Sequence, residues 1–333
     1  MSLKRDIKLR NAQLKLRDTR KNYRQLMDEH KGLLREHDAL MQIRKSVKTH
    51  KIKRGRKGKR TRAVAFAIAS DWHVEEQVRP NTINGINKYN LEIAKARADY
   101  FFERVVRMVE KEQQDAQIET LVLALLGDFM SGNIHQELLE NCLLRPIEAA
   151  IFAEELLASG IQFILDNTKL NLVVPCCVGN HTRITQKVHY STELGNSLEL
   201  MIYSHLRDRF GGDRVNFIIG TGYHVYMDVY GKVVRLHHGH AVRYGGGIGG
   251  LTIPLNKAIH QWNLTKHADL DIQGHYHQSM FMRRFVVNGS LIGYNAFALR
   301  IKAEYEPPSQ SFFLMDEKRG KTVQTPIIMN GHH

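Results

Sequence analysis

The sequence predicts an α/β fold in which a largely parallel sheet is followed by a second sheet, with a long basic helix in front. Three observations support this prediction. Short apolar runs alternate with helix-like stretches over residues 63–180, residues 216–240 alternate in period two, and positive charge is concentrated in residues 1–62. Alternating strands and helices are typical of parallel sheets, whereas period-two alternation without intervening helices is typical of antiparallel strands.

The first 62 residues differ in charge from the remainder. They hold 22 Lys and Arg against 6 Asp and Glu, a net charge of +16, whereas residues 63–333 hold 26 against 28. This difference predicts a basic helical arm and linker over residues 1–62 and a domain over residues 63–333 with the charge balance of an ordinary soluble protein. The arm indicates a polyanionic partner, and nucleic acid is the expected one.

Residues 3–47 are predicted to form one long helix, because they contain no Pro, a single Gly and many strong helix formers. Two columns occur at a spacing of seven: Leu26, Leu33, Leu40 and Val47 form one, and Leu9, Leu16 and Tyr23 begin another that continues with His30, His37 and Arg44. This is half of a coiled-coil seam. It leaves two interpretations open, a homo-oligomer formed through the helix or a leucine stripe that docks the helix on its own domain.

Residues 48–62 are predicted to be a flexible linker, because two glycines lie among dense positive charge. A solvated tether is their minimum role. The candidate nucleic-acid contacts are the basic residues of this linker, namely Lys53, Arg54, Arg56, Lys57, Lys59, Arg60 and Arg62.

In the domain, strands are expected at 63–70, 120–128 and 171–180, with helices near 90–114, 134–167 and 193–209. Residues 216–240 are expected to form antiparallel strands with a turn at Tyr230-Gly231-Lys232. A Gly-rich loop at 243–250 precedes a helix near 254–266, and further strands are expected near 269–273, 281–288 and 311–328.

Composition excludes several classes of protein. No stretch approaches the roughly 18 apolar residues that a membrane span needs, and the N-terminus lacks the apolar core of a secretory signal. Cys142, Cys176 and Cys177 have no C-x-x-C spacing, which favours small buried side chains over a thiolate metal site. A soluble protein in the reducing cytoplasm, without a membrane partner, is therefore expected.

Five polar motifs follow predicted strands: Asp71-Trp72-His73, Gly127-Asp128, Gly179-Asn180-His181, His237-His238-Gly239-His240 and Gly274-His275-Tyr276-His277. Open α/β sheets place their sites at such strand ends. Carboxylates mixed with imidazoles suit manganese, iron or zinc, whereas magnesium and calcium prefer oxygen ligands alone. Each motif alone carries little weight, but the ordered set predicts a metal site. A carboxylate such as Asp128 is able to bridge two ions about 4 Å apart.

The ordered set resembles the calcineurin-like metallophosphoesterase superfamily, whose motifs are D-x-H, G-D, G-N-H, a His followed by Gly, and G-H-x-H. The match runs from about Val64 to Gln278. Within the superfamily the general layout is most similar to SbcD-type DNA repair exonucleases and to related phage and bacterial phosphoesterases. The resemblance implies a four-layer αββα sandwich of two mixed sheets, with the motif loops meeting at one edge.

The resemblance also implies residue roles. The first of two divalent transition-metal ions would be held by Asp71, His73 and His277, and the second by Asn180, His238 and His275, with Asp128 bridging them. His181 would be the catalytic histidine that protonates the leaving oxygen. Mn²⁺ is the expected ion, with Fe, Zn or Mg as alternatives. For the fourth motif, His237 and His240 remain alternatives to His238.

The sequence departs from the family pattern in two places. Thr182 replaces the acid that commonly follows G-N-H and can orient the catalytic imidazole, and Phe129-Met130-Ser131-Gly132 follow Asp128 where many relatives have another acid. The sequence therefore does not identify the group that orients the His181 ring. Arg183, beside His181, is either a substrate contact or an ordinary surface residue.

The expected function is phosphodiester hydrolysis by a DNA or RNA nuclease that the basic arm guides to its substrate. One alternative is a phosphatase or small-nucleotide phosphodiesterase. Another is a nucleic-acid-binding or assembly protein with an inactive metal site. The ATPase that works with SbcD-type enzymes is not evident as a partner, because the expected partner-binding extension does not follow the last predicted strands.

Overall fold

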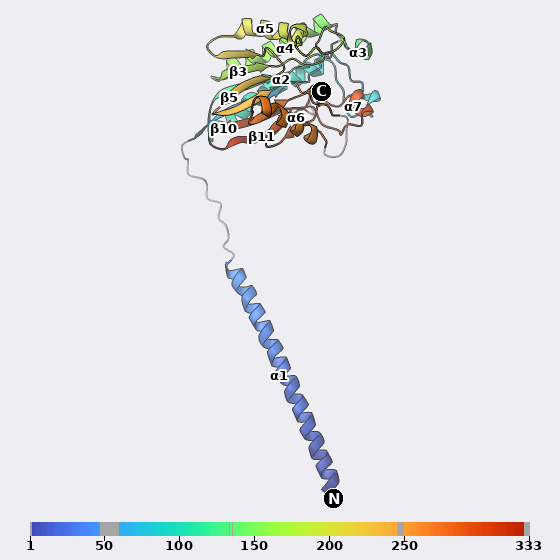
Figure 1. Cartoon of the computed structure of the whole chain (residues 1–333), viewed down its shortest axis with the longest axis vertical. Helices are drawn as coiled ribbons and strands as arrows, with labels where there is room; N and C mark the ends of the chain where they lie inside the picture. The colour runs from blue at the N-terminus through green and yellow to red at the C-terminus, as the bar shows by residue number, and fades with distance from the viewer. Residues whose placement is uncertain (1, 47–59, 133, 135, 245–249, 330–333) are drawn as a thin grey trace. The chain divides into compact units, whose positions relative to one another are not determined.

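The computed structural model describes residues 2–46, 60–132, 134, 136–244 and 250–329, and within the first helix it describes side chains from residue 7 to 38. The chain divides into two compact units, residues 1–58 and 59–333. In the first unit the described structure is one helix, α1 (Ser2–Ser46), as predicted. The other elements belong to the second unit, here called the C-terminal unit (Figure 1). Most of the predicted linker, residues 48–59, lies outside the described residues.

The first sheet has six strands in the order β11-β10-β1-β2-β3-β4. Their bounds are β1 (Thr61–Ala69), β2 (Ala116–Leu125), β3 (Asn171–Cys176), β4 (Val215–Ile219), β10 (Ser309–Asp316) and β11 (Gly320–Ile328). Strands β1 to β4 are parallel, while β10 is antiparallel to both β1 and β11. The sheet is therefore mixed, and the sequence predicts its parallel strands β1, β2 and β3 as a strand-helix-strand-helix-strand series.

The second sheet has five strands in the order β5-β6-β7-β9-β8. Their bounds are β5 (Val225–Val229), β6 (Lys232–Leu236), β7 (Leu270–Gln273), β8 (Met280–Phe281) and β9 (Phe285–Val287). Strands β6, β7 and β9 are parallel, and β5 and β8 pair antiparallel at the edges. The β5-β6 hairpin turns at Tyr230 and Gly231, both in the left-handed region that a two-residue hairpin turn requires.

Two local expectations were wrong. Residues 216–240 do not form one antiparallel set, because β4 leaves it to pair parallel with β3 in the first sheet. The helix expected at 134–167 is two helices, α3 (Gln136–Asn141) and α4 (Pro146–Asn167). The break precedes Pro146 because proline disfavours helical backbone in the residue before it, and Arg145 is extended at φ −77° and ψ 159°.

The remaining helices are α2 (Leu91–Glu112), α5 (Leu198–Phe210), α6 (Thr252–Thr265) and α7 (Ala296–Arg300), with short 3₁₀ turns at Pro80–Thr82 and Leu194–Asn196. Helices α2, α4 and α5 cover one face of the first sheet, and α6 covers the second sheet (Figure 1). Among the described residues, no helix combines the length and the apolar character needed to cross a membrane.

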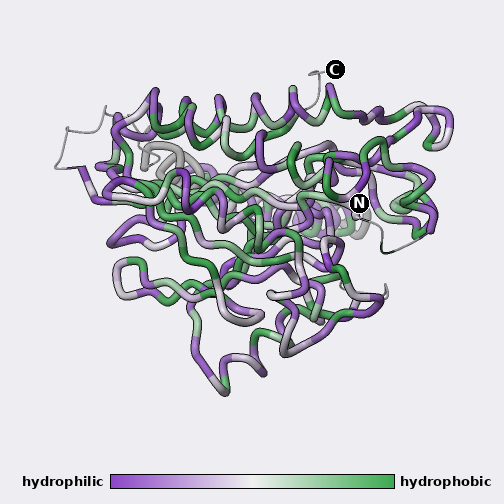
Figure 2. Tube along the Cα trace, turned by 90° about the horizontal axis from the view of Figure 1, so that it is seen from above, coloured by the Kyte–Doolittle hydropathy of each residue, from purple (hydrophilic) through white to green (hydrophobic). Residues whose placement is uncertain are grey.

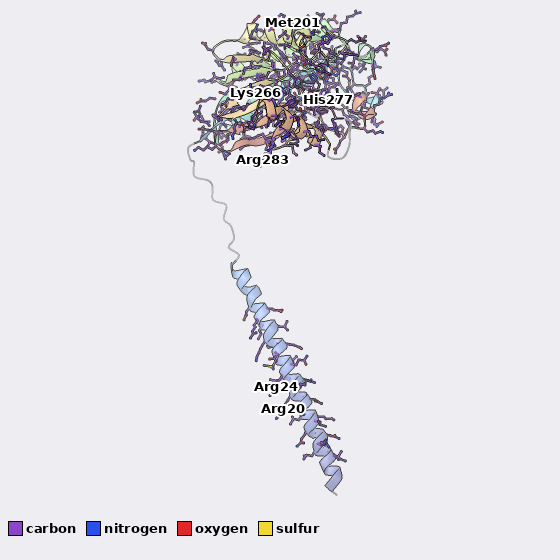
Figure 3. All side chains as sticks on the ribbon, in the orientation of Figure 1. Arg20, Arg24, Met201, Lys266, His277 and Arg283 are labelled. Atoms are coloured by element: carbon purple, nitrogen blue, oxygen red, sulfur yellow. The ribbon has the colours of Figure 1, made fainter. Side chains whose placement is uncertain are left out.

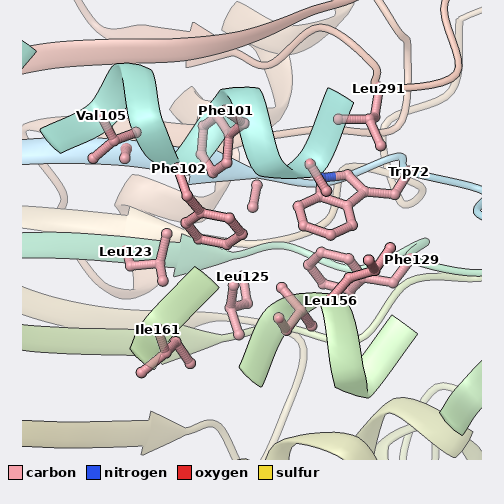
Figure 4. Packing of buried hydrophobic residues seen from close by; sticks show 14 of the residues in the cluster. Trp72, Phe101, Phe102, Val105, Leu123, Leu125, Phe129, Leu156, Ile161 and Leu291 are labelled. Carbon is pink, nitrogen blue, oxygen red and sulfur yellow. The ribbon is translucent and has the colours of Figure 1, made fainter. Parts of the chain in front are cut away.

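Three apolar clusters fill the spaces between the layers of the C-terminal unit. Successive residues of one strand contribute to different clusters, because their side chains point to opposite faces of the sheet. On β2, Leu123 and Leu125 pack in the same cluster as Phe101 of α2, under the helices (Figure 4), while Ala124 between them belongs to the cluster that faces the second sheet. The third cluster, between the second sheet and α6, contains Leu255, Ile259, Phe285 and Val287. Figure 2 shows hydrophobic segments through the middle of this unit and hydrophilic ones at its margins.

These three clusters give the order helices, sheet, sheet, helix. The two sheets pack directly on each other, with Phe66 of β1 and Phe313 of β10 stacked at 4.6 Å in the layer between them. The predicted fold class is confirmed: an α/β sandwich of two mixed sheets, with a long N-terminal helix in the other unit.

Candidate metal centre

The predicted motif residues directly follow strand ends. Asp71 and His73 follow β1, Asp128 follows β2, Asn180 and His181 follow β3, His238 follows β6, and His275 and His277 follow β7. Five of these residues have φ between 48° and 73°, namely Asp71, His73, Asp128, His275 and His277. Non-glycine residues rarely adopt this region, and such strain concentrates at functional sites. The backbone is therefore in this unusual conformation at the motif residues that follow β1, β2 and β7.

Two groups of three side chains have ligand atoms within 4.8 Å of one another. One group is Asp71, His73 and His277, and the other is Asp128, His238 and His275. Asp71 links the groups, because its carboxylate accepts a hydrogen bond from the backbone N–H of His275 at 3.0 Å. Six predicted ligands from four strand ends are thus brought together.

In the second group, Asp128 makes the closest contacts. Its Oδ2 lies 2.8 Å from Nε2 of His238, and its Oδ1 accepts the backbone N–H of His181 at 2.8 Å. Nδ1 of His275 lies 3.3 Å from Nε2 of His238. All ligand atoms of this group therefore converge beside the loop that carries Asn180 and His181.

Two buried polar atoms at the site have no hydrogen-bond partner, Nε2 of His73 and Oδ1 of Asn180. An unpaired buried polar group costs free energy, so such atoms call for a partner that protein groups do not supply. An imidazole nitrogen and an amide oxygen are both metal ligands, and with the surrounding carboxylates and imidazoles they form a donor set typical of transition metals. The residues present therefore fit two divalent ions.

Hydrogen bonds fix the rings of two candidate ligand histidines. Nδ1 of His238 donates to the carbonyl oxygen of Leu126 at 2.7 Å, which directs Nε2 toward Asp128. Nδ1 of His73 lies 3.0 Å from the Ser131 hydroxyl, which in turn donates to Glu76 at 3.0 Å. In both residues the protein holds Nδ1 and leaves Nε2 for a metal, as outer partners of metal-binding histidines usually do.

The ionisation of the site follows from burial and charge. Burial lowers the pKa of His73 and of His275 well below the ordinary range, so both rings are neutral, the form that binds metals. Burial also disfavours the charged forms of His238 and Asp128, but the positive charge of one and the negative charge of the other stabilise each other. Their contact raises the pKa of His238 to about 10 and holds the pKa of Asp128 well below its usual range.

His181 stands beside the first group, with its ring centroid 4.9 Å from that of His73. Its Nδ1 lies 3.0 Å from the backbone carbonyl oxygen of Ser131. A carbonyl only accepts, so Nδ1 carries the proton. Thr182 does not orient the ring, because its hydroxyl is bonded to that of Ser197 at 2.8 Å. The backbone of Ser131 is thus the orienter that the sequence left open.

The three adjacent histidines of the fourth motif separate in space. Only His238 among them belongs to the two groups found in the described residues. His237 packs against Trp262, with ring centroids 4.9 Å apart, and His240 contacts Glu193 at 2.7 Å. This placement favours His238 as the ligand because, of these three described histidines, His238 is the one whose ring contacts Asp128.

Sequence reasoning missed Glu199, Glu76 and Ser131. The Glu199 carboxylate accepts the backbone N–H groups of Phe129 and Gly179, at 3.0 and 2.7 Å, and so ties the second and third motif loops together. Burial raises the pKa of Glu199 to about 7. Glu199 lies in the first turn of α5, where an acid is common, and the backbone groups that it binds are remote in sequence, so no local pattern identifies it.

The motif glycines are required by close packing. A Cβ on Gly179 would lie 2.0 Å from Oδ1 of Asp128, and one on Gly274 would lie 2.3 Å from Oδ2 of Asp71. Both distances are far shorter than a non-bonded contact allows. The carboxylates therefore occupy space that only glycine leaves open.

The predicted nucleic-acid contacts are only partly described. Lys53, Arg54, Arg56, Lys57 and Lys59 lie outside the described residues. Arg60 and Arg62 are exposed, and the Arg62 guanidinium lies 5.7 Å from the centre of the Tyr230 ring. Arg183 donates to the carbonyl oxygens of Asn180 and Gln186, so it braces the third motif loop.

No protein-family model matches the chain, and no curated protein matches it. Similar solved structures include an archaeal phosphodiesterase (13% identity, TM-score 0.39, 79% of this chain and 99% of that one). Another is the calcineurin-like phosphoesterase YfkN from Bacillus subtilis (11% identity, TM-score 0.34, 81% of this chain and 92% of that one). A third is Vps29 from Entamoeba histolytica with zinc (14% identity, TM-score 0.29, 80% of this chain and 99% of that one). At TM-scores below 0.5 these likenesses identify neither a family nor an activity. The fold and site define an α/β sandwich with two adjacent groups of side chains that could hold metal ions.

Proposed function

We propose that this protein is a metal-dependent phosphoesterase of the calcineurin-like superfamily that hydrolyses phosphodiester bonds in DNA or RNA. One observation carries the proposal: two adjacent groups of ligand side chains enclose unpaired ligand atoms, with an oriented histidine beside them. A metal site that only stabilises the fold does not require an oriented histidine that is not itself a ligand. This arrangement is the one that metal-assisted hydrolysis of a phosphate ester needs.

The residues divide into ligands and a proton donor. Asp71, His73 and His277 would hold one ion, Asn180, His238 and His275 would hold the other, and Asp128 would be the carboxylate shared by both. Bound divalent ions at such a site supply positive charge that activates water and balances the charge developing on phosphoryl oxygens.

His181 supplies the general acid. Its Nδ1–H donates to the Ser131 carbonyl, so Nε2 is the nitrogen free to carry a second proton toward the departing ester oxygen. Precise orientation of this ring matters, because proton transfer requires hydrogen-bond distance to the ester.

Charge supports a nucleic acid as the substrate. Residues 48–62 hold nine Lys and Arg and no acid, close in sequence to β1, which leads directly to Asp71. A segment of this density attracts a phosphate backbone rather than a single small ester. If about six phosphates are paired, affinity falls with log salt at a slope near −5.

The test is Mn²⁺-dependent cleavage of labelled single- and double-stranded DNA and RNA, and of bis-p-nitrophenyl phosphate. Wild type is compared with Asp128→Asn and with a linker variant in which Lys53, Arg54, Arg56, Lys57 and Lys59 are changed to Gln. A matched control loses the same charge elsewhere, with Gln at Arg10, Arg17, Lys21, Arg24 and Lys31.

We expect wild type to cut strands, Asp128→Asn to lose activity on every ester, and the linker variant to bind strands more weakly than the matched control at moderate salt. Hydrolysis of the small ester or a nucleotide without strand cleavage would support the proposed catalytic site but contradict the proposed nucleic-acid substrate. The protein would then be a phosphatase or small-nucleotide phosphodiesterase. Metal binding without Asp128-dependent hydrolysis of any ester would refute the proposed enzymatic activity. The alternative would then be a nucleic-acid-binding or assembly protein with an inactive metal site.

A further inference from the structure

Helix α1 carries large apolar side chains that no other element of its own unit covers. All side chains described between residues 7 and 38 are exposed, including Leu26 and Leu33 at 62% and 65%. Figure 3 shows the side chains of α1, Arg20 and Arg24 among them, projecting all round the helix. A helix of this length in water is normally stabilised by packing of an apolar face. The apolar residues of α1 therefore point to a partner.

The apolar positions follow a repeat of 3.5 residues. With position a at Leu9, the a positions are Leu9, Leu16, Tyr23, His30 and His37, and the d positions are Ala12, Thr19, Leu26 and Leu33. An a and d seam of this spacing is the feature that packs two helices together as a coiled coil. In the first half of the seam the large apolar residues occupy the a positions, and in the second half they occupy the d positions.

We propose that α1 forms an antiparallel two-stranded coiled coil with α1 of a second copy of this chain. Antiparallel packing places a opposite d, and the register in which positions of the two copies sum to 49 pairs every a and d position between residues 12 and 37. Leu16 then faces Leu33 of the second copy, and Tyr23 faces Leu26. The two histidines face small residues, His30 opposite Thr19 and His37 opposite Ala12.

Side-chain volume distinguishes this arrangement from a parallel one. In a parallel pair each seam residue faces itself, so His30 would face His30 and Ala12 would face Ala12. The first pairing places two polar rings in one layer, and the second leaves space in another. The antiparallel register pairs large apolar side chains with each other and each histidine with a small partner.

Charge favours the same orientation. Residues 1–24 hold nine Lys and Arg against two Asp and Glu, whereas residues 25–46 hold four of each. Parallel packing would align the two strongly basic halves, whereas antiparallel packing lays each against the half that contains the acids. At the flanking g positions, Lys15 of one copy then lies beside Glu36 of the other.

The orientation has a structural consequence. Each chain continues from the C-terminal end of its own helix, so the two chains leave an antiparallel rod at opposite ends. This inference is independent of the proposed hydrolysis, because it uses only residues of α1.

The oligomeric state of the full chain tests the proposal first. Sedimentation equilibrium should give twice the chain mass of 38.3 kDa at micromolar concentration. The seam variant Leu16→Asn should raise the dimer Kd at least about tenfold, because it places an amide opposite Leu33. Leu14→Asn is the matched control, since Leu14 lies at position f, outside the seam, and carries the same helix-propensity cost. Circular dichroism of both variants checks that the C-terminal unit remains folded.

Cysteine cross-linking tests the orientation. The double variant Ala12→Cys/His37→Cys should form a disulfide-linked dimer, while Ala12→Cys alone should not. The two positions are about 38 Å apart within one helix, so a bond between them must join two copies. The native Cys176 and Cys177 are buried and Cys142 is half-buried, and wild type serves as the blank.

Three results would overturn the proposal. A monomer at all concentrations would leave docking of α1 on its own chain as the explanation of the leucine stripe. A dimer that Leu16→Asn weakens no more than Leu14→Asn does would place the contact elsewhere. Cross-linking of Ala12→Cys alone would show a parallel pair.

Discussion

The backbone carbonyl oxygen of Ser131 accepts a hydrogen bond from Nδ1 of His181 at 3.0 Å. The hydroxyl of the same serine lies 3.0 Å from Nδ1 of His73 and donates to Glu76. One residue therefore orients both a candidate metal ligand and the candidate proton donor, by different atoms. Because the two contacts use different atoms, substitution of the side chain separates them.

Ser131→Ala should lower metal affinity by roughly 10- to 100-fold, because His73 loses the hydroxyl that orients it while the carbonyl contact to His181 persists. Isothermal titration with Mn²⁺ measures the effect. Thr182→Val is the control, since the Thr182 hydroxyl is bonded to Ser197 and does not contact either histidine. Equal affinities of Ser131→Ala and wild type would show that the hydroxyl does not position His73.

His181→Gln should lower kcat on a phosphodiester by about 10²- to 10⁴-fold and leave Mn²⁺ affinity within about threefold of wild type, because His181 is placed as a proton donor rather than a ligand. Steady-state kinetics at saturating metal, beside a metal titration, separates the two effects. The loss should shrink for substrates whose leaving group needs no proton, such as p-nitrophenyl esters. A loss of metal binding in His181→Gln would make this residue a ligand.

Gly274→Ala should weaken metal binding by more than about tenfold and destabilise the fold by about 1–3 kcal/mol, because the added Cβ overlaps the Asp71 carboxylate. Gly195→Ala is a matched control, since a Cβ there meets nothing within 4 Å. Thermal unfolding with Mn²⁺ and with a chelator measures both quantities. An unchanged response to metal in Gly274→Ala would show that Asp71 is not a ligand.

His224 should make the fold less stable in acid. Burial lowers its pKa from 6.5 to about 3, so below pH 6.5 the unfolded chain binds a proton that the folded chain does not. Stability is therefore lost as pH falls from about 6.5 toward 3, by less than about 1.4 kcal/mol per pH unit from this group, because its ring is partly exposed.

Urea midpoints between pH 7.5 and 5 measure this slope. The non-titrating variant His224→Gln should lose less stability than wild type over that range, whereas His267→Gln, at an exposed position, serves as the comparison. Identical slopes for wild type and His224→Gln would contradict the assignment.

The sequence predicts the first sheet well where local and tertiary preferences agree. Strands β1, β2 and β3 are apolar runs buried on both faces, so their composition identifies them without knowledge of their neighbours. Strand β4 was assigned to the wrong sheet because its residues read equally well as an antiparallel strand. Only its pairing with β3 places it, and that pairing depends on packing of α5 against the sheet.

By itself, the sequence determined the types and the order of the chemistry-bearing residues: carboxylates, imidazoles and an amide that follow predicted strands, several of them beside a glycine. Residue type and spacing along one chain are sufficient for that conclusion. The tertiary structure alone decided which histidine of His237, His238 and His240 faces Asp128, and that the Ser131 carbonyl orients His181. Those contacts join residues 50 or more positions apart, so they depend on how the strand ends meet and not on any local pattern.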